Sequence, residues 1–282
     1  MSSQQPSRDG TCQLTGKSGR FVRSHLIPRA LTKPPPNGAA FAQIGYGRRP
    51  TRRRDSWYDL GLVVRAGEDI LSDYDNWAIA ELRRLKLVWH SWGPMQTLAT
   101  LDHTNFADSP WGIRKVQFSD PLRMRMFLLS LLWRAAATSI DEFAEIDIAT
   151  SAMRRLRNSV RDGIPPPPDF FPATLTQIST LGLMHNLGPI AQIKRVQPLS
   201  RGTASQEPIF RFYFDGLVVH FHRAPTMLTM DGIDPMLVGK SNGTVISTVT
   251  FENSWELMNH LNCIADSEHA YPGGIARAEG GD

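Results

Sequence analysis

Residues Cys12 to Leu31 read CQLTGKSGRFVRSHLIPRAL, and this stretch sets the expected fold. Gly16 and Gly19 supply turn chemistry, so the stretch predicts a β-hairpin followed by a turn into a short helix or loop. A single cysteine opens the hairpin, and His25 follows at hairpin distance within Ser24 to Pro28. This cysteine and this histidine anchor the predictions for the rest of the chain.

The composition is typical of a globular protein. The chain has 282 residues, of which 41% are hydrophobic and 21% are charged, enough for one large domain or two ordinary ones. Cys12 and Cys263 are the only cysteines, which argues against a secreted domain built on disulfides. The N-terminus lacks a signal-peptide core, and the longest apolar run, Met126 to Leu132, is too short to span a bilayer. We therefore expect a soluble, cytoplasmic protein with no membrane partner.

Positive charge is concentrated near the N-terminus. The net charge is only +4, but the first 54 residues carry a run of cations beside a single acid, Asp9. Such a cluster attracts polyanions, so it predicts contacts with nucleic-acid phosphates. We favour DNA over RNA as the partner. A solvated face, or a tail for an acidic partner, is the alternative. The candidate nucleic-acid-binding residues are Lys17, Arg20, Arg23, Arg29, Arg48, Arg49, Arg52, Arg53 and Arg54.

Hydrophobic spacing and capping residues predict four helices. The first starts at about Asp73, the second at Asp120-Pro121, and the third runs from Asp141 to near Gly163. The second is apolar nearly all round, so we expect it at the centre of the core. The fourth follows a cap at Asn253 or Ser254.

The C-terminal part is rich in β signals. The residues predict strands over 174–184, 190–196 and 245–251, and a hairpin in which Asp215-Gly216 joins 209–214 to 217–222. Phe210, Phe212 and Phe214 lie on one face of that hairpin. They can stack bases, but core packing against the last helix is the simpler interpretation.

His220 and His222 share one face of a predicted strand. A His-x-His pair can bind a transition metal, but no third ligand is evident. We interpret the pair instead as the polar face of a half-buried strand.

The opening stretch resembles the HNH/treble-clef endonuclease family. Ser24 to Pro28, SHLIP, is similar to a family variant in which a Cys-bearing turn leads through a hairpin to a histidine and then IP. Residues 67–78, GEDILSDYDNWA, and 127–134, FLLSLLWR, are similar to segments that follow that opening in prokaryotic proteins. The resemblance covers about half the chain. It implies a ββα unit in which His25 is the catalytic base, with Mg²⁺ or Mn²⁺ beside the scissile phosphate.

The chain departs from the family at its metal positions. Thr15 stands where a second cysteine is usual, residues 67–78 contain no cysteine, and Ser24 replaces the aspartate that ligates the catalytic metal. We therefore expect no structural zinc. The ββα unit would then be held by apolar packing, for which the candidates are Phe21, Leu26, Ile27, Leu31 and Trp57.

Carboxylates after the hairpin are the remaining candidates for a catalytic metal. Two of Asp55, Asp59, Glu68, Asp69, Asp73 and Asp75 could join His25 around Mg²⁺ or Mn²⁺. Asp73 and Asp75 are the weak candidates. The favoured alternative is that they are helix-start residues, stabilised by the helix dipole.

Together these patterns predict an α+β protein. An N-terminal HNH-like ββα unit packs on a helical core, and a C-terminal antiparallel β-rich domain with a terminal helix follows. The predicted organisation is a disordered lead at 1–10, an HNH-like and helical domain at 11–163, a proline-rich linker at 164–173, an α+β domain at 174–275 and a disordered tail at 276–282.

Two functions are consistent with this organisation. The first is an HNH-derived protein that interacts with nucleic acid, such as a metal-dependent DNA endonuclease of phage defence or of a mobile element. The alternative is a catalytically inactive HNH-like binding or assembly module. Such an adaptor or inhibitor would act through contacts with a protein partner from a neighbouring gene.

Overall fold

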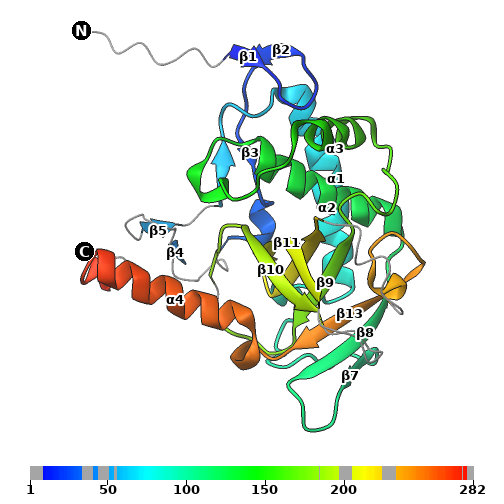
Figure 1. Cartoon of the computed structure of the whole chain (residues 1–282), viewed down its shortest axis with the longest axis vertical. Coiled ribbons are helices and arrows are strands. Elements are labelled where there is room, and N and C mark those ends of the chain that lie inside the picture. The colour runs from blue at the N-terminus through cyan, green and yellow to red at the C-terminus, as the bar shows by residue number, and fades with distance from the viewer. Residues whose placement is uncertain are drawn as a thin grey trace.

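The computed structural model describes residues 9–33, 41–43, 51–53, 56–183, 185–196, 205–223, 233–274 and 276–277. The described chain is mixed α+β, with four α-helices and one large sheet (Figure 1). Most of the predicted disordered lead and tail lies outside the described residues. Asp9 and Gly10, at the end of the predicted lead, belong to the first strand.

Seven strands form the large sheet, in the order β10-β11-β12-β9-β13-β8-β7. All neighbours are antiparallel except β9 and β13, which are parallel. The strands are β7 (His103–Asn105), β8 (Trp111–Gln117), β9 (Ala173–Ile178), β10 (Ile190–Val196), β11 (Ser205–Phe214), β12 (Leu217–His222) and β13 (Gly243–Val249). Strands from both sides of residues 164–173 therefore share one sheet.

Short strand pairs make up the N-terminal region. They are β1 (Asp9–Thr11) with β2 (Ser18–Arg20), β3 (Ser24–His25) with β6 (Tyr58–Asp59), and β4 (Phe41–Gln43) with β5 (Thr51–Arg53). The predicted hairpin and the short 3-10 helix after it, η1 (Arg29–Leu31), are confirmed. Figure 1 shows β1 and β2 at one end of the molecule and β7 and β8 at the opposite end.

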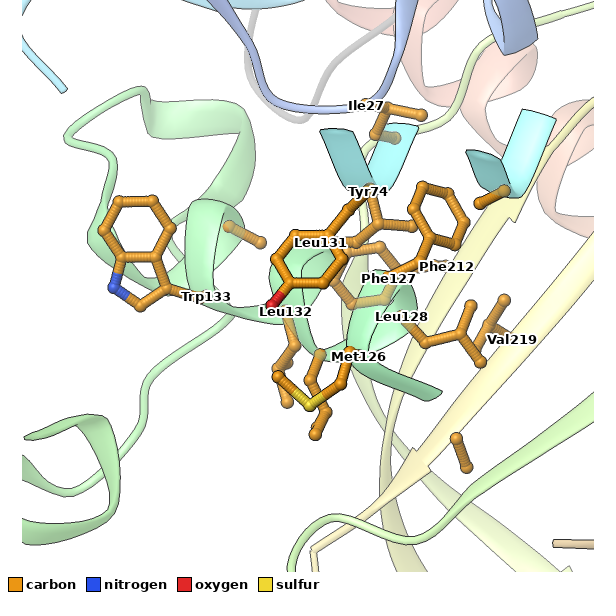
Figure 2. Close-up of a cluster of buried hydrophobic side chains, with 14 of the residues drawn as sticks. Ile27, Tyr74, Met126, Phe127, Leu128, Leu131, Leu132, Trp133, Phe212 and Val219 are labelled. Carbon is orange, nitrogen blue, oxygen red and sulfur yellow. The ribbon is translucent and has the colours of Figure 1, made fainter. Parts of the chain in front are cut away.

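The helices are α1 (Arg65–Arg84), α2 (Pro121–Ala137), α3 (Thr150–Asp162) and α4 (Trp255–Ala270). Both predictions for α2 are confirmed, namely its start at Asp120-Pro121 and its burial in the core. The Asp120 carboxylate accepts the backbone N–H of Arg123 at 2.9 Å, and most of the helix is buried. Figure 2 shows Phe127, Leu128 and Leu131 of α2 packed among Ile27, Tyr74, Phe212 and Val219.

Two predicted helix starts are wrong. α1 begins at Arg65 rather than near Asp73, and α3 begins at Thr150, because residues 141–143 form a separate 3-10 turn. Neither helix has a side-chain cap, so the local signal used to place the starts is missing. The end of α3 is confirmed, with Gly163 in the left-handed conformation at φ 70°.

The C-terminal hairpin forms as predicted. Asp215 and Gly216 both have positive φ, which fits the right-handed twist of a two-residue turn. The prediction for the aromatic face is wrong in one respect. Phe210, Phe212 and Phe214 are buried in the core cluster that contains α2, whereas Tyr213 belongs to a second cluster, against which Leu257 of α4 packs. Because these phenylalanines are fully covered, they offer no surface for stacking bases.

The proline-rich segment is docked on the core rather than spanning a gap. The buried Arg125 guanidinium donates to the carbonyl oxygens of Pro167 at 2.7 Å and Phe170 at 3.1 Å. Phe170 and Phe171 pack against the same hydrophobic cluster as α2. Packing is therefore continuous from the residues before this segment to those after it.

Helix length and polarity bear on the membrane prediction. In the described part of the chain, none of the helices combines the length and apolar character that crossing a bilayer requires.

Candidate nucleic-acid interface

The β1–β2 hairpin ends in a tight turn over residues 12–17. The Cys12 N–H donates to the Lys17 carbonyl at 2.9 Å, and the Gly16 N–H donates back to the Cys12 carbonyl at 2.9 Å. The Thr15 N–H points at the Cys12 sulfur, 3.4 Å away. This turn places Lys17 on the surface, and β2 ends with the exposed Arg20.

Apolar contacts hold this turn on the first helix. Cys12 is 1% exposed, and a Cβ on residue 67 would lie only 2.7 Å from its sulfur, so the turn approaches α1 where only glycine fits. The prediction of apolar packing in this unit is confirmed. Leu26, Ile27, Leu31 and Trp57 are all buried, and Phe21 packs against them.

After the turn, β3 pairs with β6, which directly precedes α1, and η1, β4 and β5 lie between β3 and β6 in the chain. Ser24 pairs with Asp59 and His25 with Tyr58 in antiparallel register. The α+β class is confirmed by the helices and the large sheet, whereas the HNH-like identity of this unit stays a prediction.

His25 lies half-buried beside an aromatic side chain. Its ring meets the Tyr58 ring edge-on, with centroids 6.2 Å apart, and the Arg23 guanidinium lies 4.2 Å from the centroid of the same tyrosine. The His25 carbonyl accepts a hydrogen bond from Arg134 at 3.2 Å. Tyr58 thus links the candidate base to an exposed cation.

Asp73 and Asp75 are each held by an arginine. The buried Arg134 guanidinium binds both oxygens of Asp75, at 2.6 and 3.0 Å, and Arg123 binds Asp73 at 2.8 Å. Both acids lie in the interior of α1, so the interpretation of them as helix-start residues is wrong. Asp75 faces a cation that already neutralises it, which leaves it a poor partner for Mg²⁺.

Other carboxylates near β3 are also poorly suited to bind a metal ion. Asp59 accepts the Thr138 hydroxyl at 2.6 Å and the Gly61 N–H at 2.7 Å. Burial raises the pKa of Glu68, and the charge of Arg134 opposes the rise. A metal is bound by the deprotonated carboxylate, which burial disfavours.

The described residues do not fit a resident divalent metal. Among them, no three His, Cys, Asp or Glu side chains converge as a metal site would require. Asp55 lies outside the described residues. We therefore assign no chemical step at His25 to Mg²⁺ or Mn²⁺.

The predicted cations fall into three groups. Lys17, Arg20, Arg23 and Arg29 are exposed. Arg52 and Arg53 lie in β5, opposite Ala42 and Phe41 of β4, and only their backbone is described. Arg48, Arg49 and Arg54 lie outside the described residues. The structure thus presents the first group on the surface of residues 17–29.

The predicted His-x-His face is fully buried. His220 contacts the guanidinium of Arg211 at 2.9 Å, and His222 contacts the Thr174 hydroxyl at 3.1 Å. Burial lowers the pKa of both rings, that of His222 to about 4. Every residue of β12 is buried, so the expectation of a half-buried strand is wrong.

One contact between titratable side chains was not predicted from the sequence. The His90 ring nitrogen Nδ1 lies 2.7 Å from Asp215 Oδ1, and the Asp215 carboxylate also faces the His90 backbone N–H. The Asp-Gly pair predicted a turn, which is present. Nothing in the sequence pairs two residues that are 125 positions apart.

Comparison with known proteins adds no relative. No family model, curated protein or solved structure matches this chain. The interface is therefore described by its own geometry, which consists of exposed cations along residues 17–29, a half-buried histidine, and carboxylates paired with arginine.

Proposed function

We propose that this chain is an HNH-derived protein that binds duplex DNA through the phosphate backbone without metal-dependent cleavage. The carrying observation is the exposure of Lys17, Arg20, Arg23 and Arg29 along the stretch that holds His25. The ion pair between Asp75 and Arg134 supports binding over cleavage, because it neutralises a candidate metal ligand with the same guanidinium that contacts the His25 carbonyl.

Backbone recognition fits the kind of cations present. Guanidinium and ammonium groups on exposed turns bind phosphate oxygens and read no sequence. The contact with Tyr58 restrains the Arg23 side chain, so less conformational entropy is lost when Arg23 binds a phosphate. Affinity should then depend steeply on salt and weakly on sequence.

Fluorescence anisotropy with a labelled DNA duplex tests this proposal. Replacing Lys17 and Arg20 by Ala should weaken binding at least about tenfold and reduce the slope of log K against log salt by about 2, roughly one for each phosphate that is no longer neutralised. The matched control replaces Lys115 and Arg195, two exposed cations of the large sheet, with the same change in net charge. Equal losses in both double variants would contradict a defined interface, as would the absence of binding.

A plasmid assay separates binding from cutting. Supercoiled DNA with Mg²⁺ or Mn²⁺ should show no nicking that depends on His25. Nicking by the wild type that His25→Ala abolishes would overturn the assignment and restore the endonuclease. If DNA binding is absent and a protein partner co-purifies, the assembly module becomes the better description.

A further inference from the structure

A cavity of about 390 Å³ lies between the β1–β2 turn, the C-terminal half of α2, and α3. Gln13 comes from the turn, Trp133 from α2, and Met153, Arg154 and Arg157 from α3. This volume is within the range of sites that bind small organic molecules. None of the residues used for the proposed DNA interface lines the cavity.

Two N–H donors in the cavity wall lack an acceptor. Trp133 Nε1 and Arg157 Nε are buried and make no hydrogen bond within the described part of the chain. The Trp133 side chain is 0% exposed, and Figure 2 shows its nitrogen pointing away from the apolar cluster around Leu131. An unpartnered buried donor is costly, and a ligand that offers an acceptor removes that cost.

The charge of the wall selects an anion. Arg154 is exposed and Arg157 is half-buried at the same cavity, and the described lining contains no acidic residue. Arginine presents a planar set of donors that matches the oxygens of a phosphate. Two guanidinium groups and an indole N–H together favour an acceptor-rich anionic group.

The remaining wall suits a flat apolar body. Ile148 and Met153 line the same cavity as Trp133 and pack against the same hydrophobic cluster, and the Gln13 amide adds a group that can both donate and accept. A thioether and aliphatic carbons pack well against an aromatic ring, and an amide can bond the polar edge of a base.

We infer that this cavity binds one nucleotide, with its phosphate on Arg154 and Arg157 and its base over Met153 and Ile148, beside Gln13. The nucleotide is either free or the unpaired 5′-phosphorylated end of a strand. The residues that would hold it are separate from those of the proposed duplex interface.

Titration calorimetry on the full chain tests the site with five ligands. These are dAMP, deoxyadenosine, inorganic phosphate, and a short single strand with or without a 5′-phosphate. We expect dAMP to bind at least about tenfold more tightly than either deoxyadenosine or phosphate alone, because base and phosphate bind different walls. If the strand with a 5′-phosphate binds more tightly than the strand without it, the natural ligand is a strand end. If the two strands bind equally and dAMP binds tightly, the ligand is a free nucleotide.

Matched variants locate the binding. Arg157→Gln should weaken dAMP at least about tenfold, because it removes one charge-assisted hydrogen bond. Arg155→Gln, on the same helix, is the control, because that guanidinium lies over Phe170 at 4.8 Å and does not line the cavity. Ala137→Leu fills the cavity from a partly buried position, so it should weaken dAMP while the unfolding midpoint stays near that of the wild type.

Three results would overturn the site. They are equal affinity for phosphate and dAMP, equal losses in Arg155→Gln and Arg157→Gln, or unchanged binding when Ala137→Leu fills the cavity. The Lys17 and Arg20 double variant should keep full affinity for dAMP. Loss of duplex binding and loss of nucleotide binding are therefore separate outcomes.

Discussion

Arg134 is a buried guanidinium that joins three elements. It is 1% exposed, binds both oxygens of Asp75 on α1, and donates to the carbonyl of His25 on β3. A charge removed from water is tolerated only when a partner and hydrogen bonds compensate it. This one side chain therefore fixes α1 and β3 against α2, and it positions the strand that carries the candidate histidine.

Asp75→Asn tests how much this pair matters. The substitution leaves Arg134 buried without its counter-ion, so the free energy of unfolding should fall by about 3–5 kcal/mol. Asp73→Asn is the control, because its pair with Arg123 is largely exposed and should cost less than about 1 kcal/mol. Urea titrations of both variants give the comparison. Similar small losses would show that Arg134 finds other compensation.

At the scale of elements, caps divide the helices into two kinds. α2 and α4 begin at side chains that accept a backbone N–H, namely Asp120 and Ser254. α1 and α3 begin at Val64 and Ala149, which cannot do so. The starts of α2 and α4 are therefore determined by a capping residue in the local sequence. The starts of α1 and α3 depend instead on where their apolar residues pack against the core.

The cap of α4 gives an element-scale prediction. The sequence allows either Asn253 or Ser254, and in the structure the Ser254 hydroxyl accepts the Leu257 N–H at 3.3 Å. Ser254→Ala should lower the free energy of unfolding by about 1 kcal/mol. Asn253→Ala should change it by less than about 0.5 kcal/mol, since that residue is exposed. Chemical unfolding curves decide between them, and the reverse order would place the cap at Asn253.

At the scale of the whole molecule, the face of the sheet opposite α2 buries histidines. His185 stacks on Tyr213, with ring centroids 4.8 Å apart, and meets His260 at 4.5 Å. Burial lowers the pKa of His185 to about 4, helped by the neighbouring His260, and burial brings the pKa of His222 to about 4 as well. Both rings are therefore held neutral in the folded protein at neutral pH.

Acid should unfold this protein through these rings. A histidine with a folded pKa below its unfolded value of about 6.5 takes up a proton on unfolding, so its full stability is present above pH 6.5 and is lost as pH falls toward 4. Each ring contributes up to about 3 kcal/mol across that window, at about 1.4 kcal/mol per pKa unit. Urea midpoints from pH 7.5 to 4 measure the loss.

Variants of two histidines check the origin of this pH dependence. His185→Phe keeps an aromatic ring against Tyr213 and removes the titrating group, so the midpoint should fall less steeply with acid. His269→Gln changes an exposed histidine of α4 and should leave the pH profile unchanged. A profile that is identical in all three proteins would exclude His185 as a source of the acid sensitivity.

The candidate interface could be predicted in part. The cations at residues 17–29 and the burial of Leu26, Ile27, Leu31 and Trp57 follow from local composition, because exposure and burial track polarity. The state of the carboxylates could not be predicted. Asp75 and Arg134 lie 59 positions apart, and their pairing depends on how α1 and α2 cross.

The sequence by itself determined the elements whose signals are local, namely the β1–β2 turn, the Asp215-Gly216 hairpin, the capped starts of α2 and α4, and the apolar character of α2. Only the tertiary structure decided which face of the β11–β12 hairpin meets α2, and that β8 joins β13 in one sheet. The physical reason is range. Caps and turns are formed by hydrogen bonds between residues a few positions apart. Strand pairing and buried ion pairs join residues that are far apart in the sequence, so they depend on how the whole chain packs.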